Sequence, residues 1–322
     1  MSASAPATMI VLSAADVAAL LDLDELVDAL AVAMVDLSTG RASAPPRVAA
    51  QTVSPPGLLA AMPAYLPSAS ALTTKLVTQF PGNRDRPTHQ AIICCFDPRE
   101  GTPLALIDGD HLTAARTAAG SALATRLLAR PGAREVAVVG TGVQAISHAH
   151  ALIRLPGIEV VRIAGRNPDK VAYVVRELGG FAEAADSIEA AVRSADIVCA
   201  ATHTDAPVLQ RDWLRPGAHV NSVGYNTTGT GEVDPATVAA AVVVVEQRDA
   251  ALRPPPAGAV ELADLDPAAV VEIGELVADP ALVDREALTL YKSVGVAVQD
   301  AAAAALVLRA AAERGLGTRI TI

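Results

Sequence analysis

One stretch limits the fold more than any other: Glu135-Val-Ala-Val-Val-Gly-Thr-Gly-Val-Gln-Ala145. A short β-branched run ends in Gly140, Gly142 and Ala145, and a helical pattern follows directly. Strand, tight glycine turn and helix in this order form the first βα unit of a dinucleotide-binding domain. Gly140 permits the turn, and Gly142 lets the backbone approach a pyrophosphate. The phosphates then meet the free N–H groups of the helix that begins near Val143.

Short apolar strands and helices alternate after Pro131-Gly132. Repeated βα units predict a mostly parallel sheet with helices on both faces. We therefore predict an α/β fold in which residues 131–293 form a Rossmann-type, doubly wound domain. Strands are expected at 135–140, 159–164, 197–201, 218–223 and 241–246, with a weaker one near 180–184.

A different pattern precedes that domain, with strand-like runs that lack helices between them, such as Ala71–Phe80. It favours an antiparallel or mixed sheet. Residues 1–12 look like a loose start, and the proline-rich segment 44–66 is typical of extended chain and turns. An alanine-rich helix near residues 294–314 is not needed by an open nucleotide-binding sheet, so we expect it to return to the first domain.

We therefore predict a discontinuous α+β domain made of residues 1–130 and 294–322. Of the 322 residues, 52% are hydrophobic but only 2% are aromatic, which predicts a core of small aliphatic side chains. The net charge of −10 argues against nucleic acid or an anionic membrane as partner. We find no spanning segment and no signal-peptide pattern, and we expect a cytoplasmic protein.

The cysteines and histidines predict no metal site. Cys94 and Cys95 are adjacent in a strand-like run and point to opposite faces. His148 and His150 are two apart on a predicted helix, which places them on different faces. Three cysteines in a chain of this length favour a reducing compartment.

Arg166 bears on which dinucleotide binds. The second strand of such a domain ends at the adenine ribose, where a carboxylate selects NAD and a basic side chain accommodates the 2′-phosphate of NADP. Here the strand runs into Gly165-Arg-Asn-Pro-Asp-Lys170, so we favour NADP(H) over NAD(H). The alternative is that Arg166 is a solvated loop residue and Asp169 holds the ribose, although Asp169 is better placed to cap the next helix.

Lys75 stands out in the first half because it lies in mid-strand between apolar neighbours. A desolvated lysine can lose its proton near neutral pH and serve as an acid or base. The alternative from the periodicity is an edge-strand lysine that guards against aggregation. Arg47 and Arg116 could each clamp a carboxylate or phosphate, or simply be solvated.

Eight motifs, taken together and in order, resemble the ornithine cyclodeaminase/mu-crystallin family over nearly the whole chain. They are Met62-Pro-Ala-Tyr65, Lys75-Leu-Val, Phe80-Pro-Gly-Asn83, Pro103-Leu-Ala-Leu-Ile-Asp108, Leu112-Thr-Ala-Ala-Arg-Thr-Ala-Ala119, Gly140-Thr-Gly-Val-Gln-Ala145, Trp213-Leu-Arg-Pro-Gly-Ala-His-Val-Asn221 and Tyr291-Lys-Ser-Val-Gly295. The family includes cyclodeaminases, an alanine dehydrogenase and ketimine reductases. The resemblance implies a homodimer whose first domain and C-terminal helix carry the substrate site and the subunit contact.

The resemblance also implies roles for single residues. Arg47 matches the arginine that holds the substrate carboxylate, Lys75 matches the active-site lysine, and Met62 and Arg116 belong to the same substrate site. The basic segment Gly165-Arg166-Asn167, followed by Lys170, resembles the NADP-binding members. The remaining matches to cofactor-contacting positions are Thr88, Arg116, Gly142, Val143, Gln144, Thr202, Val223 and Ser293, which join Gly140 of the glycine turn.

Two positions depart from the cyclodeaminase pattern. Asn226 stands where those enzymes have an aspartate that handles the proton of the amino group, and an amide cannot act as a carboxylate base. Ala60 stands where they have a glutamate that helps to hold the distal amine. Both departures weaken the case for a diamine substrate.

The leading prediction is an NADPH-dependent reductase of a small cyclic ketimine carboxylate of the Δ1-pyrroline-2-carboxylate or Δ1-piperideine-2-carboxylate type. Lys75 would protonate or polarise the imine nitrogen, with Asn226 positioning it. One alternative is an amino-acid dehydrogenase or an ornithine or lysine cyclodeaminase. Another is a protein that binds NADP(H) and a small imino or amino acid without turnover.

Overall fold

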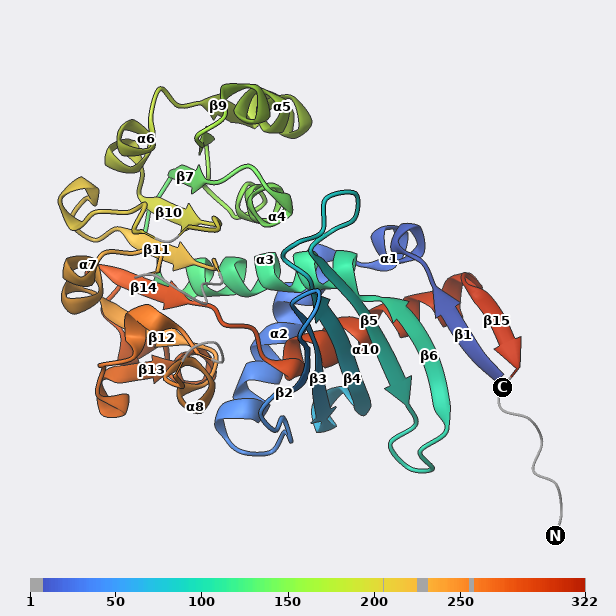
Figure 1. The fold of residues 1–322 in the computed structure, drawn as a ribbon. Coiled ribbons are helices and arrows are strands. Elements are labelled where there is room, and N and C mark those ends of the chain that lie inside the picture. Colours follow the sequence, from blue (N-terminus) through green and yellow to red (C-terminus); the bar gives the residue numbers. More distant parts are fainter. Residues whose placement is uncertain (1–7, 205, 225–230, 255–257, 322) are drawn as a thin grey trace, which may run out of the picture. The chain divides into compact units, whose positions relative to one another are not determined.

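The structure is a computed structural model that describes residues 8–204, 206–224, 231–254 and 258–321, and Figure 1 traces its fold. The chain divides into two compact units. The first unit is Met1–Arg116 with Val296–Ile322, and the second is Thr117–Gly295. The sequence placed the first boundary after residue 130; here it lies inside helix α3 (Gly109–Leu128), whose C-terminal half belongs to the second unit.

The second unit contains an eight-stranded sheet in the order β13-β12-β14-β11-β10-β7-β8-β9. All its neighbouring strands pair in parallel. The run β9-β8-β7-β10-β11-β14 has the 3-2-1-4-5-6 order of a dinucleotide-binding sheet, with its switch point between β7 and β10. The strands are β7 (Glu135–Val139), β8 (Val160–Ala164), β9 (Ala182–Ala184), β10 (Ile197–Ala200), β11 (His219–Ser222), β12 (Val242–Val245), β13 (Val270–Glu272) and β14 (Thr289–Lys292).

Side chains alternate between two cores, one on each face of this sheet. Val136 and Val138 of β7 pack on one face, whereas Ala137 and Val139 pack on the other. A strand buried on both faces has no polar alternation, which is why the sequence shows near-continuous apolar runs here. After α3, the described residues of this unit form the helices α4 (Val143–Leu152), α5 (Pro168–Leu178), α6 (Ile188–Ser194), α7 (Pro235–Ala240), α8 (Arg248–Ala251) and α9 (Ile273–Ala278).

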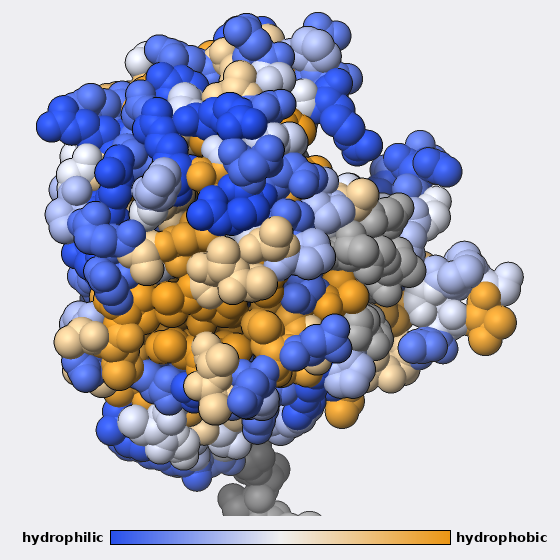
Figure 2. Space-filling model, turned by 90° about the vertical axis from the view of Figure 1, so that its left-hand side faces the viewer, coloured by the Kyte–Doolittle hydropathy of each residue, from blue (hydrophilic) through white to orange (hydrophobic). Residues whose placement is uncertain are grey.

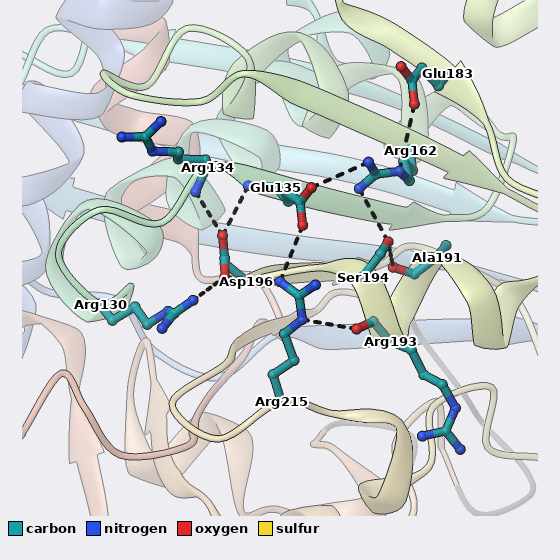
Figure 3. Close-up of polar contacts among 10 residues, drawn as sticks. All are labelled: Arg130, Arg134, Glu135, Arg162, Glu183, Ala191, Arg193, Ser194, Asp196 and Arg215. Atoms are coloured by element: carbon teal, nitrogen blue, oxygen red, sulfur yellow. Dashed lines mark hydrogen bonds and ion pairs between the residues drawn. The ribbon is translucent and has the colours of Figure 1, made fainter.

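A buried carboxylate joins the N-terminal ends of β7 and β10 (Figure 3). Asp196 accepts hydrogen bonds from the backbone N–H of Arg134 at 2.9 Å and of Glu135 at 3.2 Å. The guanidinium groups of Arg130 and Arg215 also bond to it. The Asp196 network therefore fixes the edge of the sheet opposite to the glycine turn.

The first unit contains a seven-stranded mixed sheet in the order β15-β1-β6-β5-β4-β3-β2. Only the β1–β6 pair is parallel among its described neighbours. The strands are β1 (Thr8–Leu12), β2 (Val48–Thr52), β3 (Gly57–Leu66), β4 (Ala71–Gln79), β5 (His89–Phe96), β6 (Pro103–Asp108) and β15 (Thr318–Thr321). The predicted mixed sheet is confirmed.

One sequence prediction in this unit is wrong. Residues 8–12 are not a loose start, because β1 pairs with β6 on one side and with the C-terminal β15 on the other. These pairing partners are distant in the chain and so are invisible to local patterns. The proline-rich segment 44–66 is extended chain and turn, as predicted: β2 and β3 pair antiparallel around a turn at residues 53–56, and β3 also pairs with β4.

Besides the start of α3, the described residues of this unit form the helices α1 (Ala14–Leu20), α2 (Leu23–Ser38) and α10 (Ala297–Arg314). The last one confirms the predicted alanine-rich helix, which ends at Gly315 in the left-handed conformation. It packs on β3, β4 and α2. Short 3₁₀ turns cover Pro67–Ala69, Gly179–Phe181, Arg211–Trp213, Val260–Leu262, Pro267–Ala269 and Pro280–Leu282.

The two faces of the mixed sheet differ. Beneath α10 the side chains of β3, β4 and β5 are buried, Lys75 among them. The other face, which we call the open face, exposes large apolar side chains such as Leu59 (46%) and Ile92 (47%). Figure 2, which shows the left-hand side of the view in Figure 1, has hydrophobic side chains gathered in one area of the surface, bordered by hydrophilic ones.

Within the described ranges, no helix is long and apolar enough to cross a membrane. The same residues contain no group of three or more His, Cys, Asp or Glu side chains that could hold a metal ion. His148 instead contacts the Ser121 hydroxyl through Nε2 at 3.0 Å and the Gln144 carbonyl through Nδ1 at 2.7 Å.

Candidate active site

A buried carboxylate organises the candidate substrate site of the first unit. Asp300, in the first turns of α10, lies 3.0 Å (Oδ1) and 2.9 Å (Oδ2) from Lys75 Nζ. Its Oδ1 also accepts a hydrogen bond from Arg116 Nε at 3.1 Å. Arg116 Nη1 donates to the side-chain oxygen of Gln299 at 3.1 Å. One strand and two helices thus bring two cations and one anion together.

The local sequence explains how α10 comes close to β3 and β4. Residues 301–304 of α10 are all alanine and buried, so the helix backbone can lie close to β3 and β4. Lys75 is in the middle of β4, between β3 and β5, and only 2% of it is exposed. The edge-strand interpretation of Lys75 is therefore wrong, because β4 has a paired strand on each side.

The surroundings of Lys75 tune its proton affinity. Burial lowers the pKa of Lys75 to about 8, and the positive charges of Arg116 and Arg47 act in the same direction. The Asp300 carboxylate opposes them. Burial by itself raises the pKa of Asp300, but the charges of Lys75 and Arg116 outweigh it and hold that pKa below its ordinary value.

Two other residues expected at the substrate site lie on or just before a strand. Met62 is the direct partner of Lys75 across the β3–β4 pairing and is buried. Arg47, half-buried before β2, is near enough for its charge to act on Lys75. Thr88, which we expected to contact the cofactor, is exposed just before β5, where its carbonyl accepts the Phe80 N–H at 2.8 Å.

Sequence reasoning missed Asp300 and Gln299 at this site. The available signal was composition: an acid and an amide in the first turns of a helix that is otherwise mostly alanine and aliphatic. It also missed His89, whose Nδ1 lies 3.5 Å from Asp110 Oδ1. Burial lowers the pKa of His89, and the charge of Lys75 adds to that effect.

In the second unit the glycine turn has the shape that a pyrophosphate needs. Gly140 has φ +132°, and a Cβ atom there would lie 2.4 Å from the Ala201 carbonyl oxygen. Gly142 is the N-cap of α4, and a Cβ atom there would meet nothing within 4 Å. Gly142 has no side chain that could cap α4, and the first N–H groups of a helix are the groups that bind an anion in such turns.

The basic segment after β8 is exposed. Arg166 and Lys170 both present their side chains to solvent. Asn167, not Asp169 as expected, is the N-cap of α5, and its side chain accepts the Lys170 N–H at 3.0 Å. Gly165 packs on the glycine turn, since a Cβ atom there would lie 2.9 Å from Thr141 Cγ2.

Three expected cofactor contacts follow the C-terminal ends of neighbouring strands. Thr202 follows β10 and donates its N–H and its hydroxyl to Glu232 Oε1, both at 2.6 Å. The Val223 N–H, after β11, donates to the Ala200 carbonyl at 3.0 Å. The Ser293 hydroxyl, after β14, donates to Glu246 Oε1 at 2.6 Å. Asn226 lies outside the described residues.

Comparison with known proteins identifies relatives for the whole chain. The model of the ornithine cyclodeaminase/mu-crystallin family matches residues 7–315. The ketimine reductase mu-crystallin of Mus musculus is 38% identical over 253 residues, which are 78% of this chain and 80% of the relative.

Two solved structures share the complete fold. The Δ1-pyrroline-2-carboxylate reductase of Thermococcus litoralis, in complex with NADH and L-proline, superposes with a TM-score of 0.89 and 31% identity over 97% of this chain and 100% of that one. An archaeal alanine dehydrogenase dimer with bound NAD superposes with a TM-score of 0.87 and 28% identity over 97% and 99%. The predicted α/β fold with a Rossmann-type domain is confirmed.

Proposed function

The chain belongs to the ornithine cyclodeaminase/mu-crystallin family, and we propose that it is an NAD(P)H-dependent reductase of a small cyclic ketimine carboxylate. The substrate class is that of Δ1-pyrroline-2-carboxylate or Δ1-piperideine-2-carboxylate. Relatives named as ketimine and pyrroline-carboxylate reductases support reduction of a C=N bond.

The observation that carries the proposal is the buried Lys75–Asp300 pair. Reduction of an imine adds a hydride to carbon and a proton to nitrogen, so the site needs an acid that is protonated near neutral pH. An ammonium whose pKa is about 8 meets that need, because general acids work best when their pKa is near the working pH. Asp300 keeps this ammonium protonated despite its burial.

We assign the substrate carboxylate to the arginines. A guanidinium binds a carboxylate through two parallel N–H donors, and this fixes the plane of an imino acid. Arg47 is our candidate, because its charge already acts on Lys75. With the carboxylate held there, Lys75 Nζ donates its proton to the ring nitrogen.

The second unit would hold the dinucleotide. Gly140, Gly142 and the α4 N-terminus would bind the pyrophosphate, and Arg166 with Lys170 would meet the adenine ribose. When bound, the reduced nicotinamide supplies the hydride that the imine carbon accepts. The exposed basic pair favours NADP(H), although the two similar solved structures contain NADH or NAD.

A cyclic imine fits this site better than a diamine. Ala60 lies two residues before Met62 on β3 and shares its buried face, which is also the face of Lys75. A carboxylate at this position would add a negative charge beside Lys75, but alanine offers only a methyl group. The described residues therefore offer no anchor at position 60 for a distal ammonium.

We also propose that the chain is a homodimer through its open face. Leu59, Tyr65, Ile92 and Leu104 leave a broad apolar area on one side of the mixed sheet. Such areas mark contacts between proteins, and a structurally similar alanine dehydrogenase is a dimer. An Ile92→Asp variant should sediment as a monomer where the parent chain sediments as a dimer; a parent monomer contradicts the assignment.

The reaction is tested with purified protein, NADPH or NADH, and Δ1-pyrroline-2-carboxylate. We expect oxidation of the reduced cofactor with formation of proline, and a loss of kcat by about 10²–10⁴-fold in Lys75→Met. His111→Gln, an exposed change in the same unit, is the control. The proposal fails if neither five- nor six-membered ketimines are reduced between pH 6 and 9.

The same preparation separates the alternatives. Ammonia release from ornithine or lysine without net NADPH formation identifies a cyclodeaminase. Net cofactor reduction by a primary amino acid identifies a dehydrogenase. Tight cofactor binding without turnover, together with ligand affinity that is unchanged in Lys75→Met, identifies a binding protein.

A further inference from the structure

A fully buried glutamate lies where two strands of the second unit end, and the mechanism above does not use it. Glu232 accepts four hydrogen bonds: from the Thr202 N–H and hydroxyl at 2.6 Å, from the Gly224 N–H at 2.6 Å, and from the Ser222 hydroxyl at 3.0 Å. It therefore ties the chain after β10 to the chain after β11. Breaking one of these bonds would leave a buried donor or acceptor unsatisfied.

A buried lysine completes this group. Lys292, the last residue of β14, donates to the Gly224 carbonyl at 3.0 Å and to the Ser222 hydroxyl at 3.1 Å. Its Nζ also lies 2.7 Å from Glu261 Oε1, and both side chains are 3% exposed. We call Glu232, Lys292, Glu261 and Ser222 the edge network. It holds both backbone polar groups of Gly224, the N–H and the C=O.

Two glycines show how closely the backbone packs on this network. A Cβ atom at Gly224 would lie 2.3 Å from the carboxyl carbon of Glu232 and 2.4 Å from the Thr202 carbonyl oxygen. Gly231 has φ +83°, and a Cβ atom there would lie 2.6 Å from the carboxyl carbon of Glu261. Any larger residue at either position would displace a carboxylate of the network.

The place of the edge network in the sheet relates it to one half of the cofactor. In the 3-2-1-4-5-6 order, the first three strands serve the adenosine half of a dinucleotide and the last three serve the nicotinamide half. The edge network joins the C-terminal ends of β10, β11 and β14, which are the last three. Ligands of such sheets bind at the C-terminal ends of the strands.

We propose that Glu232 and Lys292 are positioning residues for the nicotinamide half of the cofactor. They act through the backbone of Thr202 and of Val223–Gly224, which they hold from inside the protein. The proposal deepens the proposed reductase function and rests on it. Neither side chain needs to touch the cofactor, since both point into a buried network.

A comparison within the same sheet sharpens the argument. Asp196 is also a buried, multiply bonded carboxylate, but it joins the N-terminal ends of β7 and β10 (Figure 3). If buried carboxylates here served stability alone, changes at either edge would have the same consequences. A positioning role predicts that only changes at the C-terminal edge alter the nicotinamide half of the site.

The test is the Glu232→Gln variant, which keeps the shape of the side chain. The amide NH₂ must then face an N–H or O–H donor at a former acceptor position, so the Thr202 and Gly224 backbones shift. We expect the Kd for NADPH and NADH to rise about tenfold or more, because small misplacements of a site are magnified in function. The Kd for ADP, which lacks the nicotinamide riboside, should change less than about twofold.

Two further variants keep the proposal testable if Glu232→Gln folds poorly. Ser222→Ala removes only the hydroxyl between Glu232 and Lys292, and we expect a smaller change in the same direction. Asp196→Asn is the matched control, which should lower thermal stability while leaving the ratio of the NADH and ADP dissociation constants unchanged. Lys292→Met should resemble Glu232→Gln.

The outcomes are distinct. An NADH affinity that falls in Glu232→Gln and Ser222→Ala but not in Asp196→Asn supports the positioning role. Equal loss of NADH and ADP binding, or no loss of either, overturns it. These binding measurements need no imino acid, so an incorrect substrate assignment would leave them unaffected. Where turnover is measurable, we expect the fold-change in kcat to be larger than the fold-change in the KM for the imino acid.

Discussion

Lys75 Nζ lies within 3.0 Å of both carboxylate oxygens of Asp300, although 225 residues separate the two in the chain. The pair is almost completely buried, so its attraction is screened little by water. It joins a central strand to the C-terminal helix and places a titratable ammonium at the candidate substrate site. The pair therefore both joins the two chain segments of the first unit and supplies the proton donor of the proposed reaction.

The pH profile should report Lys75 directly. Its pKa of about 8 means that the ammonium, which is the acid for reduction, is present below pH 8 and lost above it. We expect kcat/KM for imine reduction to be level below that pH and to fall about tenfold per unit above it. Oxidation of the cyclic amine needs the neutral amine of Lys75, so its rate should rise up to the same pH.

Lys75→Arg is the control for this profile. A guanidinium stays charged over the whole accessible pH range. Any residual reductase activity should therefore lack the alkaline limb of the profile, which is the fall of kcat/KM above pH 8. Persistence of the limb in Lys75→Arg would assign it to another group.

Asp300→Asn should move the alkaline limb to lower pH. The carboxylate opposes the effects of burial and of the neighbouring arginines, so its loss lowers the pKa of Lys75 below 8. Removing one partner of a buried ion pair should also lower the free energy of unfolding by about 3–5 kcal/mol. Parallel pH–rate profiles and urea titrations measure the two effects.

Asp36→Asn provides the matched comparison for Asp300→Asn. Asp36 is a buried carboxylate of α2 that accepts the Arg41 Nε–H at 2.8 Å and the Ser68 N–H at 3.2 Å. Its loss should destabilise the first unit without moving the pH limb. A limb that moves equally in both variants contradicts the assignment to Asp300.

Two glycines of the turn should respond differently to alanine. Gly142→Ala adds a methyl group to open space at φ −87°, so thermal stability should hardly change. If the pyrophosphate occupies that space, the Kd for NADPH should rise about tenfold or more. Calorimetric titration and a thermal melt of the free protein measure the two quantities.

Gly140→Ala is the contrasting case. Its φ of +132° and the 2.4 Å approach to the Ala201 carbonyl oxygen should lower stability before any cofactor is added. Unchanged NADPH affinity in Gly142→Ala would place the pyrophosphate elsewhere.

Arg166→Ser should reduce the preference for NADPH over NADH. The side chain is exposed at the end of β8, and its charge is what a 2′-phosphate needs. We expect kcat/KM with NADPH to fall about tenfold or more while that with NADH stays within about twofold. Arg176→Ser, an exposed change near the other end of α5, should alter neither value. A parent enzyme that prefers NADH refutes the NADP(H) assignment.

Local sequence signals were sufficient for the nucleotide-binding unit. Gly140 has a φ of +132°, Gly142 is the N-cap of α4 directly after the turn, and the buried strands show as continuous apolar runs. The same is true of α10, whose alanine-rich pattern ends at a left-handed Gly315. Such features depend on neighbours in the sequence, so they can be recognised without the fold.

Other features needed tertiary contacts. The strand β1 exists because β6 and β15 flank it, and the N-cap of α5 is Asn167 because of the backbone path after β8. Thr202 and Ser293 could be named from a family resemblance, but the carboxylates that hold them could not. Glu232 and Glu246 come from separate parts of the chain.

By itself, the sequence determined that the chain has a dinucleotide-binding turn, a parallel sheet around it, and a lysine in an apolar strand. Only the tertiary structure decided whether that lysine is an edge-strand residue or a buried, titratable one. The same mid-strand Lys75 could have guarded an edge, but its strand lies between two others and α10 brings Asp300 against it. Burial and an opposite charge set its pKa, and both come from residues that are distant in the chain.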